Sequence, residues 1–197
     1  MCPDRAAAWR DLLLVADVHL GKGDHFRARG LPLPPGELAE DLERLARLVA
    51  ETGARRLVVL GDLVHGRVSA ATAALVADWR AGLGCALQLV PGNHDRHEAE
   101  LPAAWGVEVL APAHAEPPFT FVHAPTAGAG RYQWAGHVHP TATFAGGGDR
   151  LRFPCFVVGA EVALLPAFSR FTGGPGMRPE PGRVRYACVG AEVVAMD

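Results

Sequence analysis

Several residue types are almost absent from this 197-residue chain. It has no isoleucine, a single lysine (Lys22) and a single asparagine (Asn93), whereas alanine, arginine, glycine and proline are abundant. We interpret this skew as a bias of base composition rather than as a sign of function. Its useful consequence is that Asn93 is a side chain that the sequence employs nowhere else.

The chain also lacks long apolar runs. The longest strongly apolar run near the start, Leu12–Ala16, is far too short to cross a bilayer, and no small-residue cleavage site of a signal peptide follows it. We therefore expect a cytoplasmic protein. With 49% hydrophobic residues the chain is long enough to bury one sizeable core, so we expect a single domain over residues 1–197.

Neither the cysteines nor the net charge indicates a class of partner. The four cysteines are scattered without a Cys-x-x-Cys pair, which argues against a zinc ribbon and a disulfide framework. The formal net charge is −2, so no overall basic field favours nucleic acid. Any contact with DNA would have to come from a local patch.

The first half of the chain alternates between apolar runs and helical patterns. Three apolar runs, Leu12–Ala16, Arg56–Leu60 and Cys85–Val90, are typical of strands buried on both faces. Helical spacing of leucine and valine over Glu37–Thr52 separates the first two, and a helix that begins after Ser69 separates the last two. This order predicts a parallel sheet with helices on its faces.

The remaining segments differ in character. Residues 22–36 are rich in Gly, Pro and Arg and are predicted to be irregular, as is the Gly/Pro-rich stretch 173–182. The second half shows no long helical pattern, and tight turn signals such as residues 146–149 separate its apolar segments. The predicted strands there are Phe119–His123, Tyr132–Ala135, Thr141–Ala145, Leu151–Val158, Val162–Leu165, Val184–Val189 and Val193–Met196. An α/β domain with two packed sheets accommodates both halves.

Polar side chains with ligand chemistry follow the predicted strands. They are Asp17, His19, Asp62, Asn93, His94, His123, His137 and His139. In open α/β sheets the carboxyl ends of parallel strands line one crevice, so residues far apart in sequence can meet there. We therefore expect these side chains to form one cluster.

The residue types suit a pair of divalent cations. Two cations roughly 3.5–4 Å apart can polarise a phosphoryl group, generate hydroxide and stabilise both in-line oxygens. A bridging carboxylate between them is needed, and Asp62 is the natural choice. Imidazole, carboxylate and one amide oxygen suit Mn, Fe or Zn better than Mg or Ca.

Each motif alone has an ordinary structural explanation. An isolated Asp-x-His arises often by chance, Gly-Asp after a strand is commonly a turn, and Gly-His-x-His can be a hairpin with two surface histidines. The occurrence of every motif at a strand end, in this order, argues against these explanations taken together.

At this point the motifs resemble a known family. The residues Asp17-x-His19, Gly61-Asp62, Gly92-Asn93-His94-Asp95, His123 and Gly136-His137-x-His139 are similar to the five motifs of the calcineurin-like metallophosphoesterases. The resemblance implies an αββα sandwich of two mixed β-sheets flanked by helices.

The resemblance also implies roles for these residues. One metal ion would bind Asp17, His19, Asp62 and His139, and the other would bind Asp62, Asn93, His123 and His137. His94 would be the catalytic histidine, which stabilises the transition state or protonates the leaving oxygen. The nucleophile would be a hydroxide on or between the metals, without a covalent phosphoenzyme.

Finer motifs indicate a branch of the family. Asp17-Val18-His19-Leu20-Gly21 and Gly61-Asp62-Leu63-Val64-His65 are similar to motifs of SbcD-type repair nucleases, whereas protein phosphatases of this superfamily carry an Asp where His65 stands. Segments 26–34, 136–140, 153–156 and 164–168 resemble the ligase-associated bacterial phosphoesterases of the PdeM group. That resemblance implies a DNA endonuclease of damage repair, with DNA ligase and helicase as possible partners.

The sequence thus predicts a Mn-dependent two-metal phosphodiesterase that acts on DNA. The same centre could instead serve a small-molecule phosphatase or a nucleotide phosphodiesterase, and a catalytically dead binding scaffold is the third alternative. Arg27, in a basic segment with Lys22, His25 and Arg29, and Arg96 are candidate phosphate-binding residues. The basic segment could equally be a solvated loop, Arg96 could pair with Glu98 or Glu100, and His65 could orient a ligand or cap its loop.

Overall fold

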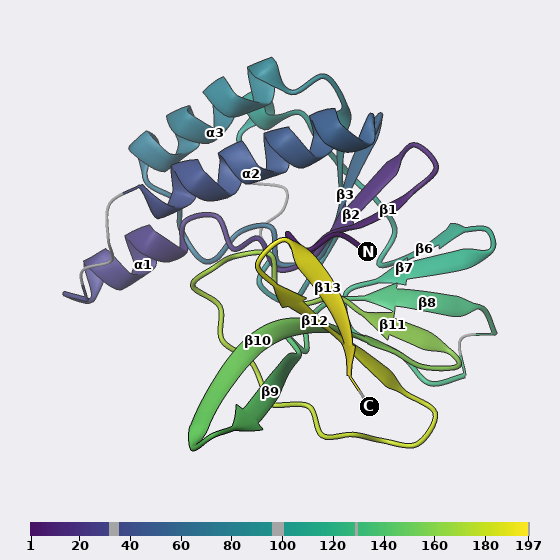
Figure 1. The fold of residues 1–197 in the computed structure, drawn as a ribbon. Helices are drawn as coiled ribbons and strands as arrows, with labels where there is room; N and C mark the ends of the chain where they lie inside the picture. Colours follow the sequence, from purple (N-terminus) through teal and green to yellow (C-terminus); the bar gives the residue numbers. More distant parts are fainter. Residues whose placement is uncertain (32–35, 96–100, 129, 197) are drawn as a thin grey trace.

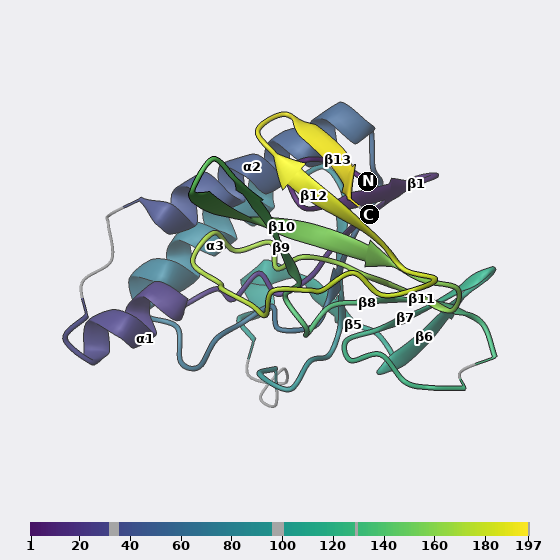
Figure 2. The same cartoon turned by 60° about the horizontal axis from the view of Figure 1, so that its bottom comes forward.

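The protein consists of two β-sheets packed face to face, with helices on the outer side of the first (Figures 1 and 2). The computed structural model describes residues 1–31, 36–95, 101–128 and 130–196. Within these ranges no helix is both long and apolar enough to cross a membrane.

The first sheet has five strands in the spatial order β1-β2-β3-β4-β5. They are β1 (Ala7–Trp9), β2 (Leu12–Val15), β3 (Arg56–Leu60), β4 (Ala86–Val90) and β5 (Val107–Val109). Strands β2, β3 and β4 are parallel, as predicted; β5 is parallel to β4, and β1 is antiparallel to β2. The edge strands β1 and β5 were not predicted, because three residues are too few to show a pattern.

The apolar runs of this sheet are continuous because both of its faces are covered. Along β2, Leu13 and Val15 belong to the core that packs on the helices. The alternate residues, Leu12 and Leu14, belong to the core between the two sheets, together with Phe121 and other residues of the second sheet. Successive side chains of a strand point to opposite faces, so every position in the run is buried.

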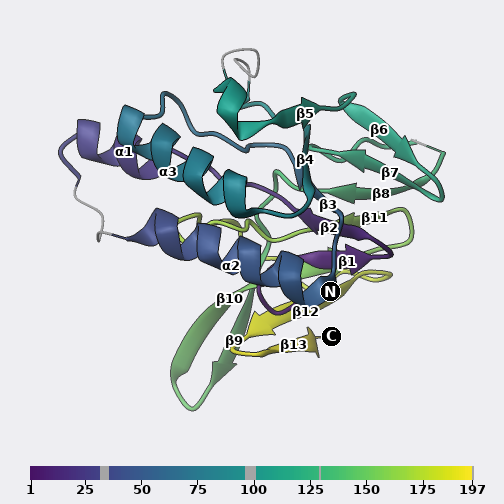
Figure 3. The same ribbon diagram turned by 90° about the horizontal axis from the view of Figure 1, so that it is seen from above.

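Two long helices, α2 (Glu37–Thr52) and α3 (Ala70–Gly82), lie side by side over the first sheet (Figure 3). The Ser69 hydroxyl accepts a hydrogen bond from the Thr72 amide at 3.1 Å and caps α3 as predicted. Gly53 ends α2 in the left-handed conformation, with φ of 64°.

The segment after β2 differs from the prediction of an irregular stretch. Lys22–Ala28 forms a short α-helix, α1. The residue before it, Gly21, has a left-handed backbone conformation. The His25 amide donates to the Gly21 carbonyl at 3.0 Å, and Asp24 accepts a hydrogen bond from the Ser69 amide at 2.8 Å. This tertiary contact outweighs the low helix propensity of the glycine-rich sequence.

The second sheet is mixed and follows the order β13-β12-β10-β11-β8-β7-β6, with β9 paired to β10. Its strands are β6 (Ala113–Glu116), β7 (Phe119–Val122), β8 (Tyr132–Ala135), β9 (Thr141–Gly146), β10 (Asp149–Val158), β11 (Val162–Leu164), β12 (Val184–Val189) and β13 (Glu192–Met196). All the strands predicted for this half are present, with each end within two residues of the prediction, and β6 is additional. The predicted turn between β9 and β10 contains Gly147 and Gly148, both at positive φ.

Candidate metal centre

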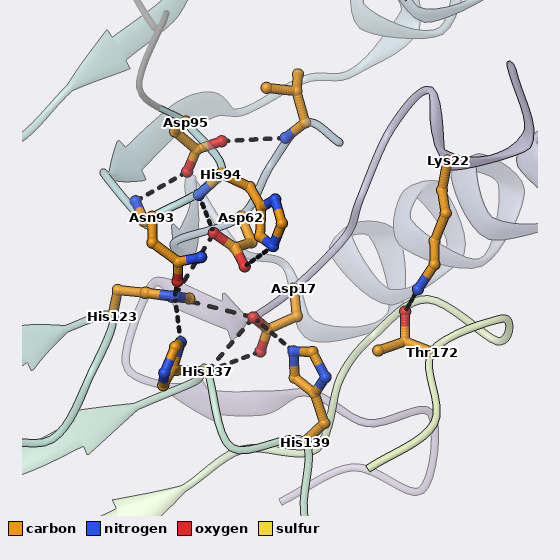
Figure 4. Close-up of polar contacts among 12 residues, drawn as sticks. Asp17, Lys22, Asp62, Asn93, His94, Asp95, His123, His137, His139 and Thr172 are labelled. Carbon is orange, nitrogen blue, oxygen red and sulfur yellow. Dashed lines mark hydrogen bonds and ion pairs between the residues drawn. The ribbon is translucent and has the colours of Figure 1, made fainter. Parts of the chain in front are cut away.

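The seven side chains predicted as metal ligands lie in one cluster. Figure 4 shows six of them, and the seventh, His19, groups with Asp17, Asp62 and His139. Each follows the carboxyl end of a strand: Asp17 and His19 follow β2, Asp62 follows β3, Asn93 follows β4, His123 follows β7, and His137 and His139 follow β8. The first sheet thus contributes four of these residues and the second sheet contributes three.

Backbone hydrogen bonds continue the strand pairing into the motifs of the first sheet. The Asp17 amide donates to the Gly61 carbonyl at 3.1 Å, and the His19 amide donates to the Asp62 carbonyl at 2.9 Å. These two motifs are therefore held side by side by main-chain contacts alone.

Further hydrogen bonds connect the two sheets. The His137 amide donates to Oδ2 of Asp17 at 3.0 Å, and Nδ1 of His123 lies 3.0 Å from the Leu60 carbonyl. A carbonyl oxygen can only accept, so Nδ1 of His123 carries the proton. Nε2 is then the ring nitrogen that can bind a metal ion.

The backbone of the cluster adopts a rarely used conformation. Non-glycine residues at positive φ are uncommon, yet five of the seven such residues found in the described part of the chain are members of this cluster. They are Asp17 (57°), His19 (53°), Asp62 (52°), His137 (68°) and His139 (51°). Strained backbone concentrated in this way is typical of a functional site.

The glycines that precede the motifs allow them to approach closely. A Cβ atom on Gly61, where φ is 78°, would lie 2.1 Å from Nδ1 of His123. A Cβ on Gly136 would lie 2.6 Å from Cβ of Ala16 and 2.8 Å from Oδ2 of Asp17. Only glycine leaves room for the two sheets to bring their motifs together.

Four side chains form what we call the deep group: Asp17, His19, Asp62 and His139. One ligand atom from each lies within 4.8 Å of the others, and the first three residues are buried. Nε2 of His139 is 3.0 Å from Oδ1 of Asp17 but makes no hydrogen bond, and Nδ1 of His19 is also buried without a partner among the described residues. Burial lowers the pKa of His19 to about 2, so its imidazole is neutral.

The remaining side chains, with Asp62, form the outer group: Asp62, Asn93, His123 and His137. Nε2 of His123 is the centre of this group. It lies 2.9 Å from Oδ1 of Asn93, 3.0 Å from Nδ1 of His137 and 3.5 Å from Oδ1 of Asp62.

Asp62 belongs to both groups. Its Oδ1 also accepts a hydrogen bond from the His94 amide at 2.9 Å, and its side chain is 2% exposed. In the deep group, Nδ1 of His19 and Nε2 of His139 are buried without hydrogen-bond partners among the described residues, which is unfavourable unless a cation binds them. Imidazole nitrogens with carboxylate and amide oxygens are suitable ligands for a divalent transition metal. The cluster therefore fits a metal centre with two adjoining positions, with Asp62 between them.

His94 lies at the rim of the cluster. Its side chain is 44% exposed, and its Nε2 is 3.9 Å from Oδ2 of Asp62. Beside it is a cleft of about 520 Å³. The cleft is lined by Val64, Gly66, Arg67, Val68, His94, Leu101 and Pro102. Arg67 is the one arginine among the described lining residues, and sequence reasoning gave no role to it.

His65 lies between His94 and α1. Its ring centroid is 4.8 Å from that of His94, 5.2 Å from that of His19 and 4.9 Å from that of His25. Burial lowers the pKa of His65 to about 4, with a further contribution from the charge of neighbouring His94. The position favours the predicted orienting role over a cap for its own loop.

Asp95 is a structural member of the site that the sequence did not single out. It is fully buried, Oδ1 accepts from the Val64 amide at 3.1 Å, and Oδ2 accepts from the Gly92 amide at 2.9 Å. These bonds fix the turn that carries Asn93 and His94. The sequence signal was present, since Asp95 completes the Gly-Asn-His-Asp motif, but its partners are distant in sequence.

The structure does not place either predicted phosphate-binding residue, Arg27 or Arg96, in the cluster. Arg27 pairs with Glu37 at 3.0 Å and with Asp24 at 3.6 Å, so its guanidinium is engaged between α1 and α2. Arg96 lies outside the described residues. Lys22 instead lies close to the cluster: its Nζ donates to Oγ1 of Thr172 at 2.7 Å (Figure 4), and burial lowers its pKa.

Comparison with known proteins agrees with this geometry. The model of the calcineurin-like phosphoesterase family matches residues 11–153, which contain every residue of the cluster. The chain belongs to the calcineurin-like phosphoesterase family. Its two packed sheets have the αββα sandwich fold of that family, and the protein is a metal-dependent phosphoesterase.

Two solved structures are similar to this chain. The nuclease MPE of Pseudomonas putida is 37% identical, the match covers 100% of this chain and 94% of that one, and the TM-score is 0.87. Yfce, a phosphoesterase from E. coli, is 18% identical over 94% of this chain and 97% of its own, with a TM-score of 0.49. A search of the curated proteins found no significant match.

Proposed function

We propose that this protein is a manganese-dependent phosphodiesterase that cuts DNA as an endonuclease. The observation that carries the proposal is the convergence of seven side chains with ligand atoms around two adjoining positions, on a fold shared with a nuclease along the whole chain. Mixed imidazole, carboxylate and amide donors favour Mn, Fe or Zn over Mg or Ca.

The proposed ligand scheme follows the two groups of the cluster. The deep group, with Asp17, His19, Asp62 and His139, would bind one ion, and the outer group, with Asp62, Asn93, His123 and His137, would bind the other. When bound, two such cations polarise a phosphoryl group and lower the pKa of an attacking water. The fixed tautomer of His123 and the neutral ring of His19 keep their lone pairs available.

In this proposal His94 acts on the leaving group. The hydrogen bond from its amide to Asp62 fixes its position beside the outer group, and its exposed ring borders the cleft. It can therefore place a proton near the leaving oxygen of a diester whose leaving part occupies that cleft. Arg67 in the cleft would attract a neighbouring phosphate.

The finer identity rests on the resemblance to the PdeM group. It implies that the enzyme acts in DNA repair beside a DNA ligase and a helicase, in the cytoplasm, and that residues 1–197 form one metallophosphoesterase domain. The shared core between the sheets supports the last point, because residues from both halves of the chain pack in it. Co-purification with a ligase or helicase would test the partners.

The proposal is tested by metal analysis and by three substrates. We expect about two divalent ions per chain, hydrolysis of bis(p-nitrophenyl) phosphate with Mn, and nicking of supercoiled plasmid. Release of phosphate from nucleotides with intact plasmid would instead indicate the small-molecule phosphatase. A protein that binds no metal would contradict the centre itself.

The role of His94 has its own variant and control. His94→Ala should abolish turnover of the diester while the metal content stays at the wild-type value. His114→Ala is the matched control, because His114 lies in β6 against Glu116, away from the cluster. Retained activity in His94→Ala would remove His94 from the mechanism.

A further inference from the structure

The hairpin of β9 and β10 is a projecting element that the site described above does not use. It begins at Thr141, two residues after His139, and its outer part extends away from the second sheet (Figure 1). In Figures 1 to 3 it projects on the same side of the molecule as α1. Residues 149–152 are all exposed.

The two faces of this hairpin differ in charge. Alternation along β10 puts Arg150 and Arg152 on one face, opposite Ala145 and Thr143 of β9. Small partners leave both guanidinium groups open to solvent. Asp149, the one carboxylate of the hairpin, lies on the other face with Leu151, Phe144 and Phe153. No acidic side chain of the hairpin therefore shares the face of the arginines.

The arginines of this face differ from two other exposed arginines, Arg170 and Arg183. Arg170 pairs with Glu40 at 3.0 Å, and Arg183 pairs with Glu180 at 3.0 Å. In the described ranges, neither Arg150 nor Arg152 has an ion pair or a side-chain hydrogen bond. A pair of exposed cations on one face, without counter-charges, is suited to phosphate groups.

The arginine face is joined to the metal centre by the loop at residues 173–182. A Cβ on Gly174 would lie 1.7 Å from the His139 carbonyl oxygen, so the loop packs directly on the chain at His139. Two residues further on, a Cβ on Gly176 would lie 3.9 Å from Nη2 of Arg152. The Thr141 amide donates to the Pro175 carbonyl at 3.0 Å and anchors the loop to β9.

The hairpin itself is firmly held. The rings of Phe144 and Phe153 are in edge-to-face contact with centroids 5.5 Å apart, and both pack on the core of the second sheet. β9 and β10 pair over six residues each. An arm fixed in this way can hold its arginines at a constant position relative to the metal centre.

We propose that the arginine face of the β9–β10 hairpin binds the phosphate backbone of duplex DNA next to the cleavage site. This inference rests on the proposed function, because it requires that the substrate of the metal centre is a DNA duplex long enough to reach the hairpin. It also supplies the local basic patch that a chain of net charge −2 needs in order to hold DNA.

The test compares the removal of single arginines from the hairpin with the removal of an exposed arginine elsewhere. Arg150→Ala and Arg152→Ala remove a cation from the hairpin. Arg131→Ala is the matched control: Arg131 is exposed, has no ion pair in the described chain, and precedes β8 at the end opposite to His137. Plasmid nicking with Mn is measured at several salt concentrations, together with hydrolysis of bis(p-nitrophenyl) phosphate, which is too small to reach the hairpin.

Each hairpin variant should lower kcat/KM for plasmid about threefold to tenfold through KM, and should reduce the slope of its logarithm against log salt by about 0.9. Arg152→Lys should recover most of the loss, because it keeps the charge. Hydrolysis of the small diester should not change in any variant.

Two results would overturn the inference. One is plasmid nicking by the hairpin variants that equals that of Arg131→Ala at every salt concentration. The other is an equal loss on plasmid and on the small diester, which would assign the effect to the metal centre. A wild-type protein that leaves plasmid intact would remove the proposed function and this inference together, whereas normal wild-type nicking with unaffected variants removes the inference alone.

Discussion

The deep and outer groups of the candidate centre differ in their contact with solvent. In the deep group, Asp17 is 0% exposed and His19 is 4% exposed. In the outer group, Asn93 and His137 are exposed, and the rim residue His94 lies beside them. One end of the centre is thus enclosed by the two sheets, and the other end opens to the surface.

This difference in exposure predicts different roles for the two metal positions. A buried ion site surrounded by backbone hydrogen bonds is suited to permanent occupancy, whereas an open site can exchange a water or a ligand atom for a substrate oxygen. We therefore expect the substrate to approach from the outer group, which is the side of His94 and the cleft.

The strongest test of this division removes the residue that both groups share. Asp62→Ala should abolish binding of both ions and lower diester hydrolysis by at least about 10³-fold, because the bridging carboxylate and the anchor of the His94 amide are lost together. Metal analysis and initial rates measure the effect. Asp78→Ala in α3, where the side chain is exposed, is the control. A variant at Asp62 that keeps two ions would contradict the assignment.

A smaller effect should distinguish the two groups. His19→Ala should lose the deep ion and His137→Ala should lose the outer ion, each with about a 10²-fold loss of activity. His137→Ala, which leaves the deep group intact, should keep most of the rise in unfolding temperature that Mn gives, since the enclosed ion exchanges less readily. Calorimetry with and without Mn, combined with metal analysis, decides the matter. Equal metal loss in the two variants would show that the groups are not independent.

The smallest expected effect is a loss of folding stability caused by a steric clash in the outer group. Gly61→Ala introduces a Cβ against His123 and should destabilise the fold by about 1–3 kcal/mol beyond the cost of the left-handed backbone. Gly53→Ala is the matched control, because Gly53 also has positive φ but has open space around it. Urea unfolding of both variants measures the difference. If the two free energies of unfolding change equally, the close approach at Gly61 is not a constraint.

The sequence predicted the parallel sheet and the long helices well because their signals are local. A continuous apolar run such as Arg56–Leu60 indicates a doubly covered strand, and Ser69 indicates a helix start. Strands β1, β5 and β6 were missed because they are short and are held by their neighbours. Helix α1 was missed because its main support, the contact between Asp24 and Ser69, joins distant residues.

For the candidate site, residue types were predictable and pairings were not. The positions of strand ends indicated that Asp17, Asp62 and His123 would meet. The pairing of Arg27 with Glu37, the anchoring by Asp95 and the place of Arg67 in the cleft depend on side-chain directions that a sequence does not contain. Tertiary contact, not local pattern, decides which of several nearby cations faces the site.

The left-handed residues of the cluster are held by main-chain hydrogen bonds, such as the one from the Asp17 amide to the Gly61 carbonyl. We therefore expect the backbone of the cluster to keep its conformation after dialysis against a chelator. Reloading with a different cation then becomes a practical route to cobalt or cadmium forms of the enzyme for spectroscopy, with no refolding step.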